Sequence, residues 1–374
     1  MVATTVLNRW PGAAAQGLGD CIMEFVFTEE QVMIGETARA FFAENATSER
    51  TRAAMAADGI DRALWSAFCQ DLGLSGIGIA EAAGGAGLGL VELAIIAEAA
   101  GAQVAALPML GSLALAAQAL AAGGSAAQQA EWLPALLSGE RIAGYVHDAA
   151  LVADGDLLSG ADHFVAHGAA AGVLVVTSNT GAWIVPADAA GVTITAQTTM
   201  DQTRPYARVV LAGARGMPLA DPAAAIRAAH RAGFVSVAAE ALGGAQAALD
   251  RTVAYARERV QFGRPIGSFQ AYKHRLADMM IEIEQARSAV YWAACAVDEG
   301  SDETELAVHA AKSFAADTYF MCAGNMIQLH GGIGFTWEHD AHLYFKRARA
   351  IQSMLGSGNW HREKIATMIL GEAA

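Results

Sequence analysis

The sequence predicts a protein of three parts, helical at both ends and built of β-strands in the middle. Apolar residues recur at helical spacing from Thr28 to about Leu137, and again from Asp221 to the end of the chain. Between Gly139 and Gly216 they form short runs separated by Gly, Asp, Asn and Thr, which is typical of strands and turns. The 374 residues are 54% hydrophobic and 17% charged, with 39 glycines and long Ala-rich stretches, so we expect a large core of closely packed helices.

The first helix is predicted to begin near Thr28. Residues 1–22 carry no helical pattern, and we expect them to be an unstructured extension. Thr28 has the position of an N-cap and Gln31 follows three residues later, as in a capping box. Met23 is therefore a candidate for the natural start of the protein, and the N-terminal helical domain is expected to span residues 23–138.

Three breaks divide this domain into helices, at Asn45, at Gly73 and at the Gly-rich segment 84–89. The Gly-rich segment could be mistaken for a phosphate-binding loop. It lacks both the preceding strand and the Lys-Ser/Thr pair that such a loop requires, so we interpret it as a connection between helices.

The middle β-domain is expected to span residues 139–216, and its strand candidates are 172–177, 182–186 and 207–211. The C-terminal helical domain is expected to span residues 217–374. Its helical pattern is interrupted at 261–267, 300–302 and 331–334, which predicts several helices joined by short connections.

Charge and cysteine content exclude several classes of function. The net charge of −14 provides no broad positive field for nucleic acid or for an anionic membrane. The four cysteines, Cys21, Cys69, Cys295 and Cys322, lie far apart without metal-ligand spacing, and reduced thiols are expected. His330 and His339 lack the neighbours of a metal site. The N-terminus has no signal peptide pattern, so the protein is expected to be cytoplasmic.

Two segments of the C-terminal part carry a family signature. The first runs from Tyr255 to Gln270 and reads YARERVQFGRPIGSFQ, and the second runs from Gln328 to Gly334 and reads QLHGGIG. With these motifs, the chain after Met23 resembles the acyl-CoA dehydrogenases. The resemblance implies an N-terminal α-helical domain, a middle β-domain and a C-terminal four-helix bundle. It also implies FAD as cofactor and an acyl-CoA as substrate.

The resemblance assigns cofactor contacts to both motifs. In the family the first motif contacts FAD that is held mainly by a neighbouring subunit, which here implies Arg259, Gln261 and Phe262. A buried pyrophosphate needs N–H donors and a cation, and Arg259 suits that task. The second motif implies a hydrogen bond from Gln328, and a close approach of the backbone at Gly332.

The catalytic carboxylate of the family is missing at both of its known positions. In acyl-CoA dehydrogenation a carboxylate removes the α-proton while the β-hydrogen leaves as hydride to flavin. The usual position of that carboxylate falls at Leu355 or Gly356, and the position used by a minority of the family falls near Gly233. Glu240 lies seven residues beyond Gly233, which is about 10 Å of helical rise, so a structural or interface role is expected for it. No catalytic residue is assigned.

The family's flavin-binding pattern is also altered in the middle domain. The segment 142–154 has no counterpart of the family's TEPxxGSD-like sequence and is shortened. The family's aromatic-x-Thr strand corresponds to Phe164-Val165-Ala166, which keeps the aromatic residue and loses the hydroxyl.

The residues that would contact a neighbouring subunit's cofactor are present, whereas those that would hold the chain's own cofactor are missing. This combination favours a subunit of a heteromeric enzyme. The chain resembles subunits of actinobacterial α2β2 acyl-CoA dehydrogenases that act on steroid side chains, which implies a second dehydrogenase subunit, a bulky acyl-CoA and an electron-transferring flavoprotein as acceptor. Two alternatives remain open. One is a self-sufficient homotetramer with a relocated base, and the other is a non-enzymatic scaffold of the same fold.

Overall fold

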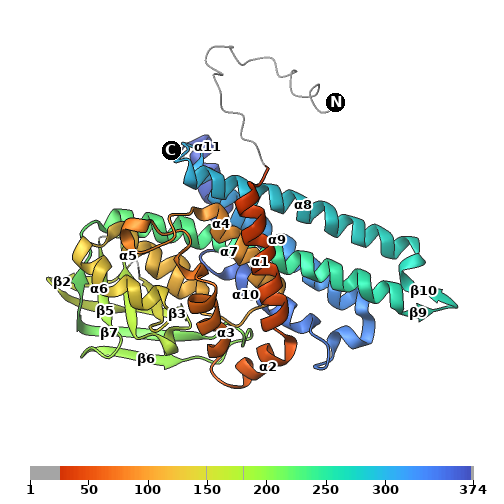
Figure 1. The fold of residues 1–374 in the computed structure, drawn as a ribbon, viewed down its shortest axis with the longest axis horizontal. Helices are drawn as coiled ribbons and strands as arrows, with labels where there is room; N and C mark the ends of the chain where they lie inside the picture. Colours follow the sequence, from red (N-terminus) through yellow and green to blue (C-terminus); the bar gives the residue numbers. More distant parts are fainter. Residues whose placement is uncertain (1–25, 149, 180, 372–374) are drawn as a thin grey trace, which may run out of the picture.

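The computed structural model describes residues 26–148, 150–179 and 181–371, and it has the three parts in the predicted order (Figure 1). The expected extension 1–22, the candidate start Met23 and Cys21 lie outside the described residues. Cys69, Cys295 and Cys322 are free thiols, as expected, and burial raises the pKa of Cys69 to about 12.

The N-terminal part is helical. Its first helix begins as predicted: the Thr28 hydroxyl accepts from the Gln31 N–H at 3.2 Å, and the Gln31 side chain accepts from the Thr28 N–H at 3.0 Å. The helix ends at Asn45, and Gly73 adopts the left-handed conformation, so both predicted breaks are confirmed. The α-helices of this part are α1 (Glu29–Asn45), α2 (Ser48–Ala56), α3 (Arg62–Ser66), α4 (Leu90–Ala102), α5 (Gln118–Gly123) and α6 (Ala126–Leu137), with π-helical segments at Ala67–Asp71 and Met109–Ala117.

The middle part forms two small four-stranded sheets rather than one. One sheet has the order β1-β4-β5-β8, in which β1 and β4 are parallel, and the other is antiparallel with the order β2-β3-β7-β6. All three strand candidates are confirmed as β4, β5 and β7. The strands are β1 (Ala143–His147), β2 (Val152–Asp154), β3 (Leu157–Ala166), β4 (Val173–Thr177), β5 (Ala182–Pro186), β6 (Val192–Ala196), β7 (Tyr206–Arg215) and β8 (Met217–Pro218).

The C-terminal part, as far as Gly371, contains three long helices and two shorter ones. Asp221 caps the first of them by accepting from the Ala224 N–H at 2.9 Å, and Pro222 occupies the first helical position. A hairpin joins the first two long helices. The elements are α7 (Pro222–Glu258), β9 (Val260–Gln261), β10 (Arg264–Pro265), α8 (Gln270–Asp298), α9 (Thr304–His330), α10 (Ala341–Ser353) and α11 (Gly358–Leu370).

Close helix packing explains the content of alanine and glycine. A Cβ added at Gly243 of α7 would lie 1.9 Å from the Glu98 carbonyl of α4, and one added at Gly101 of α4 would lie 2.2 Å from the Glu240 carbonyl. The two backbones therefore touch directly. Among the described helices, α7 alone is long and apolar enough to span a membrane by length and composition, and 94% of its most apolar 18-residue window is buried within the fold.

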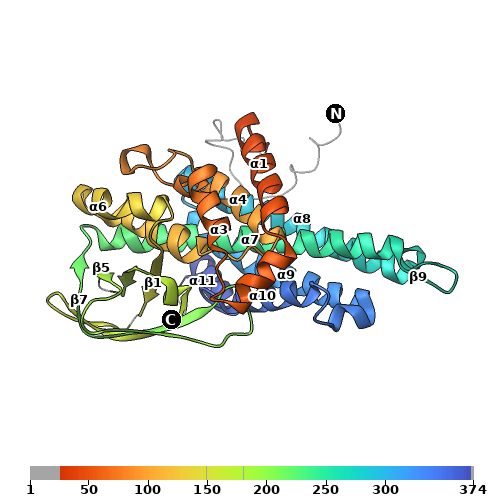
Figure 2. The same cartoon turned by 60° about the horizontal axis from the view of Figure 1, so that its bottom comes forward.

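The two ends of the long helices face different surroundings. In Figures 1 and 2 the sheets lie at one end of the molecule, while α7 and α8 run out to the β9–β10 hairpin at the opposite end. Because an α-helix rises 1.5 Å per residue, the 37 residues of α7 span roughly 55 Å. The hairpin is therefore remote from the middle domain of its own chain.

Candidate functional site

The two motif segments meet at the hairpin end of the molecule. The Tyr255 ring near the end of α7 stacks on the His330 ring at the end of α9, with centroids 4.5 Å apart. The Tyr272 hydroxyl at the start of α8 donates to the Leu329 carbonyl at 2.8 Å. These contacts hold the hairpin and the loop after α9 against each other, which the sequence spacing alone does not determine.

The five residues assigned to cofactor contact all lie exposed at this end, which we call the tip: Arg259, Gln261, Phe262, Gln328 and Gly332. Arg259 and Gln328 make no side-chain hydrogen bond or ion pair within the described part of the chain, and the Gln261 amide donates only to the adjacent Val260 carbonyl at 2.8 Å. Nothing lies within 4 Å of a Cβ built on Gly332. A guanidinium and two amides are thus free to meet a ligand from outside the chain, and this donor set suits a diphosphate.

A second group of residues brings together Gly233 and Leu355, which the family resemblance singled out as positions where the catalytic carboxylate is expected. A Cβ built on Gly233 of α7 would lie 3.1 Å from the Leu355 Cδ1 and 2.5 Å from the Leu115 Cδ2. Residues that are 122 positions apart in sequence therefore face one another, and the side chains at this point are apolar. Leu355 adopts φ +53°, an unusual conformation for a residue with a Cβ.

A side chain at the alternative position, Gly356, would point toward Trp360 and His361 rather than toward Gly233. Its φ is +101°, and a Cβ there would lie 2.6 Å from the Trp360 ring and 3.2 Å from the His361 Nε2. Leu355 and not Gly356 therefore faces Gly233. The space beside Gly356 is filled by aromatic side chains.

Two buried side chains, Lys312 and His361, bind the backbone of the loop 354–357 between α10 and α11. The Lys312 ammonium donates to the Gly356 carbonyl and, at 3.4 Å, to the Gln352 carbonyl. Burial lowers the pKa of Lys312 to about 8. The His361 Nε2 lies 3.1 Å from the Leu355 carbonyl, so this nitrogen carries the proton, and its Nδ1 accepts from His309 at 2.7 Å.

A group of aromatic rings surrounds His309 and His361, and no pattern in the sequence indicated it. The Phe234 ring, which follows Gly233, lies 4.9 Å from the His361 ring, 5.2 Å from the His309 ring and 5.8 Å from the His230 ring. Trp360 completes the group at 5.5 Å from the His309 ring. These rings come from α7, α9 and α11, and no local pattern marks them.

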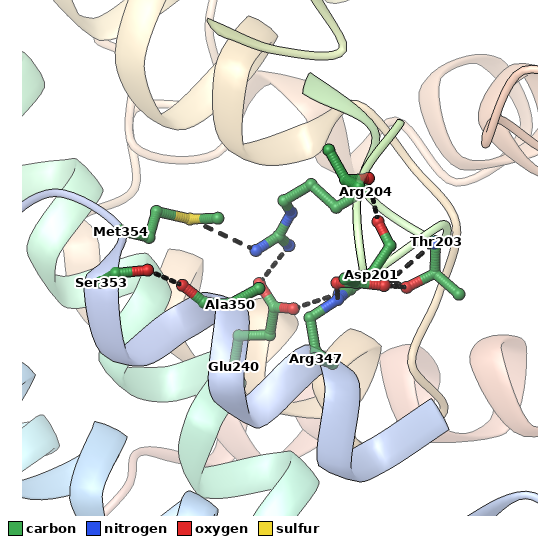
Figure 3. Close-up of polar contacts among 9 residues, drawn as sticks. Asp201, Thr203, Arg204, Glu240, Arg347, Ala350, Ser353 and Met354 are labelled. Atoms are coloured by element: carbon green, nitrogen blue, oxygen red, sulfur yellow. Dashed lines mark hydrogen bonds and ion pairs between the residues drawn. The ribbon is translucent and has the colours of Figure 1, made fainter. Parts of the chain in front are cut away.

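Glu240 is part of a buried ion-pair network, shown in Figure 3, that links α7 to α10 and to the loop before β7. Its carboxylate accepts from both Arg204 and Arg347. Arg347 also donates to the Asp201 carboxylate at 2.7 Å and to the Thr203 hydroxyl at 2.6 Å. Burial alone would raise the pKa of Glu240, but the charges of Arg204 and Arg347 outweigh it and lower the pKa. This agrees with the expected structural role.

Strand β3 carries Phe164-Val165-Ala166, the segment that the sequence resemblance likened to the family's flavin-packing strand. Phe164 is exposed on it and meets the Tyr206 ring edge-on at 6.1 Å, while Ala166 offers no side-chain donor. His167, which follows, is buried at φ +53°. Burial, reinforced by the charges of Arg204 and Arg347, lowers the pKa of His167 to about 3, so this residue is neutral.

The Gly-rich segment 84–89 ends at a helix whose N-terminus is already occupied. The Asp298 carboxylate, at the end of α8, accepts from the Leu90 N–H at 2.7 Å and the Val91 N–H at 3.0 Å. An acidic side chain thus takes the place that a phosphate would have in a phosphate-binding loop. The interpretation of this segment as a connection agrees with that geometry. Within the described ranges, no group of three His, Cys, Asp or Glu residues is placed to hold a metal ion.

Comparisons with known proteins find the same family at both helical parts of the chain. The family model "Acyl-CoA dehydrogenase, C-terminal domain" matches residues 223–370, and "Acyl-CoA dehydrogenase, N-terminal domain" matches residues 28–140. The chain is 40% identical over 331 residues to acyl-CoA dehydrogenase IpdE2 of Mycobacterium tuberculosis, covering 88% of this chain and 94% of that protein.

Two solved structures share the whole fold. A variant of the Tcur3481–Tcur3483 steroid acyl-CoA dehydrogenase has a TM-score of 0.85 and 33% identity, covering 91% of this chain and 98% of that one. The ChsE4–ChsE5 complex from Mycobacterium tuberculosis has a TM-score of 0.86 and 29% identity, covering 94% of this chain and 100% of that one.

Proposed function

The chain belongs to the acyl-CoA dehydrogenase family, and on that basis we propose that it is the subunit of a heteromeric enzyme that contacts the partner's FAD and supplies no catalytic base. The family is FAD-dependent, and the enzyme is an acyl-CoA dehydrogenase. The observation that carries the proposal is the combination of free donors at the tip with an apolar pair, Gly233 and Leu355, where the family has its carboxylate.

The tip residues fit the cofactor by the chemistry of their donors. Arg259 offers a guanidinium to the diphosphate, Gln261 and Gln328 offer amides, and Gly332 leaves room for a ligand beside the backbone. Phe262, exposed at φ +54°, can pack against a ring. When bound, FAD supplies the acceptor for the hydride.

Distance within one chain supports contact in trans. Arg259 follows the last residue of α7, and Gly233 lies 26 residues earlier on the same helix, so roughly 39 Å of helical rise separates them. The tip and the Gly233–Leu355 position of one chain are therefore too far apart to share a flavin ring. Residues at the tip act on a site that belongs to another subunit.

The self-sufficient alternative requires a base, and Glu240 is poorly suited to be one. Both of its carboxylate oxygens are engaged by arginines, its side chain is buried, and its pKa is lowered. A general base needs a free oxygen within hydrogen-bond reach of the substrate. The scaffold alternative leaves the unpaired donors of the tip without a role.

The substrate and partners follow from similarity. A bulky, steroid-derived acyl-CoA thioester is proposed because one neighbouring structure is a steroid acyl-CoA dehydrogenase and another is a two-component complex. The proposed assembly is an α2β2 heterotetramer in the cytoplasm, with an electron-transferring flavoprotein or a similar acceptor, and without nucleic-acid or membrane partners.

The test is the flavin absorbance per chain, measured on the protein purified alone and after co-expression with the product of an adjoining acyl-CoA dehydrogenase-like gene. We expect flavin only with the partner, at about one per pair of chains. Stoichiometric flavin on the chain alone would favour the homotetramer, and a complex without flavin would favour the scaffold.

Substitution Arg259→Ala is expected to release FAD from the assembled complex, because a charge-assisted hydrogen bond contributes about 1.5–3 kcal/mol. That range corresponds to roughly a 10- to 150-fold rise in the FAD dissociation constant. The matched control is Arg208→Ala, an exposed arginine of the middle domain far from the tip. Equal flavin retention in both variants would count against the assignment of Arg259 as an FAD contact.

A further inference from the structure

The imidazole of His330 lies between the two motif segments of the tip and is buried, with 4% of its surface exposed. Its ring stacks on the Tyr255 ring of α7, with 20° between the two planes, and the His339 ring contacts it at 4.5 Å. In sequence His330 stands two residues after Gln328 and two before Gly332, which are both exposed. A buried ring thus stands at the centre of the second motif.

The orientation of the His330 ring is set within its own segment. Its Nδ1 lies 2.7 Å from the Met326 carbonyl, one turn earlier on α9, and since a carbonyl only accepts, this nitrogen carries the proton. Burial lowers the pKa of His330, so the ring is neutral at pH 7. A Cβ built on Gly334 would lie 2.9 Å from the His330 Cβ, so the turn after α9 folds back onto this residue.

Hydrogen bonds connect the stacked rings to the proposed FAD contacts. The Arg259 N–H donates to the Tyr255 carbonyl at 2.9 Å, and the Arg259 carbonyl accepts from the Ile266 N–H at 2.8 Å across the hairpin. A movement of Tyr255 therefore moves Arg259, and a movement of His330 moves the neighbouring Gln328. Because Tyr255 stacks on His330, this single contact sets the distance between the two donors.

We infer that His330 is a positioning residue for the cofactor, whose stack on Tyr255 places Arg259 and Gln328 so that both bind the same FAD. The inference rests on the proposed function, because the FAD contacts come from it. His330 is buried and acts only through the placement of the two donors. Since the stack exists before FAD binds, the donors need not be brought together on binding, which increases the affinity.

The test measures the FAD dissociation constant of the assembled complex, from the recovery of free-flavin fluorescence on dilution. His330→Leu removes the flat ring and is expected to raise the constant about three- to tenfold, the range that an aromatic pair contributes. His330→Phe keeps a flat ring and should recover most of the affinity. The control is Phe68→Leu, the same kind of change in a buried ring of the N-terminal part, which should lower the melting temperature and leave the constant unchanged.

A double variant shows whether His330 acts through its neighbours. If it positions Arg259, the variant with both Arg259→Ala and His330→Leu should lose less affinity than the product of the two single effects. A loss equal to that product would overturn the positioning role. Tyr255→Leu breaks the same stack from the α7 side, and it provides the same test if the His330→Leu chain does not assemble.

The outcomes distinguish this inference from the proposed function. If Arg259→Ala weakens FAD binding while His330→Leu and Tyr255→Leu leave it unchanged, the positioning role is overturned and the FAD contact stands. If Arg259→Ala has no effect, the proposed contact fails and the positioning role fails with it. An equal loss of affinity in Phe68→Leu and His330→Leu would also overturn the positioning role, since it would reflect only lower stability.

Discussion

Glu240 is a buried carboxylate whose role could be catalytic or structural, and its contacts decide between the two. It is the carboxylate nearest in sequence to Gly233, yet it is bound by Arg204 and Arg347 inside the fold. The two arginines anchor the loop before β7 and helix α10 to α7. A carboxylate in this environment stabilises the arrangement of three segments and has no free oxygen for a substrate.

Substitution Glu240→Gln is expected to lower the free energy of unfolding by about 3–5 kcal/mol, because it leaves the buried Arg204 guanidinium without its carboxylate and removes one of the two carboxylates that Arg347 binds. Chemical denaturation of the purified chain measures this loss. Turnover per bound flavin in the complex should stay near wild type. A loss of turnover by orders of magnitude, in a variant that melts at the wild-type temperature, would instead identify Glu240 as a relocated base.

At the scale of elements, α4 depends on a cap from another helix. Gly89 precedes the helix and has no side chain to cap it, and the Asp298 carboxylate from the end of α8 bonds to the first two N–H groups instead. A Cβ on Gly89 would lie 2.3 Å from that carboxylate, so a larger residue there would displace the Asp298 side chain from the helix N-terminus. The Gly-rich segment thus serves helix packing.

Replacing Asp298 with alanine should therefore destabilise the protein by about 1 kcal/mol, the usual cost of a lost N-cap. Thermal unfolding followed by circular dichroism measures the change. Asp298→Asn keeps one acceptor and should recover part of the loss. Equal melting temperatures for wild type and the alanine variant would show that the contact contributes nothing.

For the whole molecule, buried histidines make stability depend on pH. Burial lowers the pKa of His167 to about 3 and, together with the charge of Lys312, lowers that of His361 to about 3. The unfolded value is 6.5, so the unfolded state binds more protons between these values. The stability that these residues contribute is present above pH 6.5 and is lost as the pH falls toward 3.

Unfolding free energies measured at pH 7 and pH 5 should therefore differ, with the protein less stable at pH 5 by on the order of 1–2 kcal/mol for each of these two histidines. A His167→Asn variant, which cannot be protonated at this position, should show a smaller difference between the two pH values. An identical stability at both would contradict the burial of neutral imidazoles.

Much of the architecture was predictable because its causes are local. Helical spacing and the cap at Thr28 depend on residues within a few positions of one another, and both predictions are confirmed. The family signature is equally local, since the motifs around Arg259 and Gln328 are continuous segments, and the comparisons confirm the family.

Only the tertiary structure decided which side chains share a site. Leu355, rather than Gly356, faces Gly233 because backbone torsions and the packing of Trp360 direct the two residues apart. The arginine partners of Glu240 lie 36 and 107 residues away, and no periodic pattern connects them. Sequence by itself determined the order of elements and the family, because these follow from short-range chemistry. Which side chains face one another in the site depended on contacts between distant segments, and these contacts form only when the chain is folded.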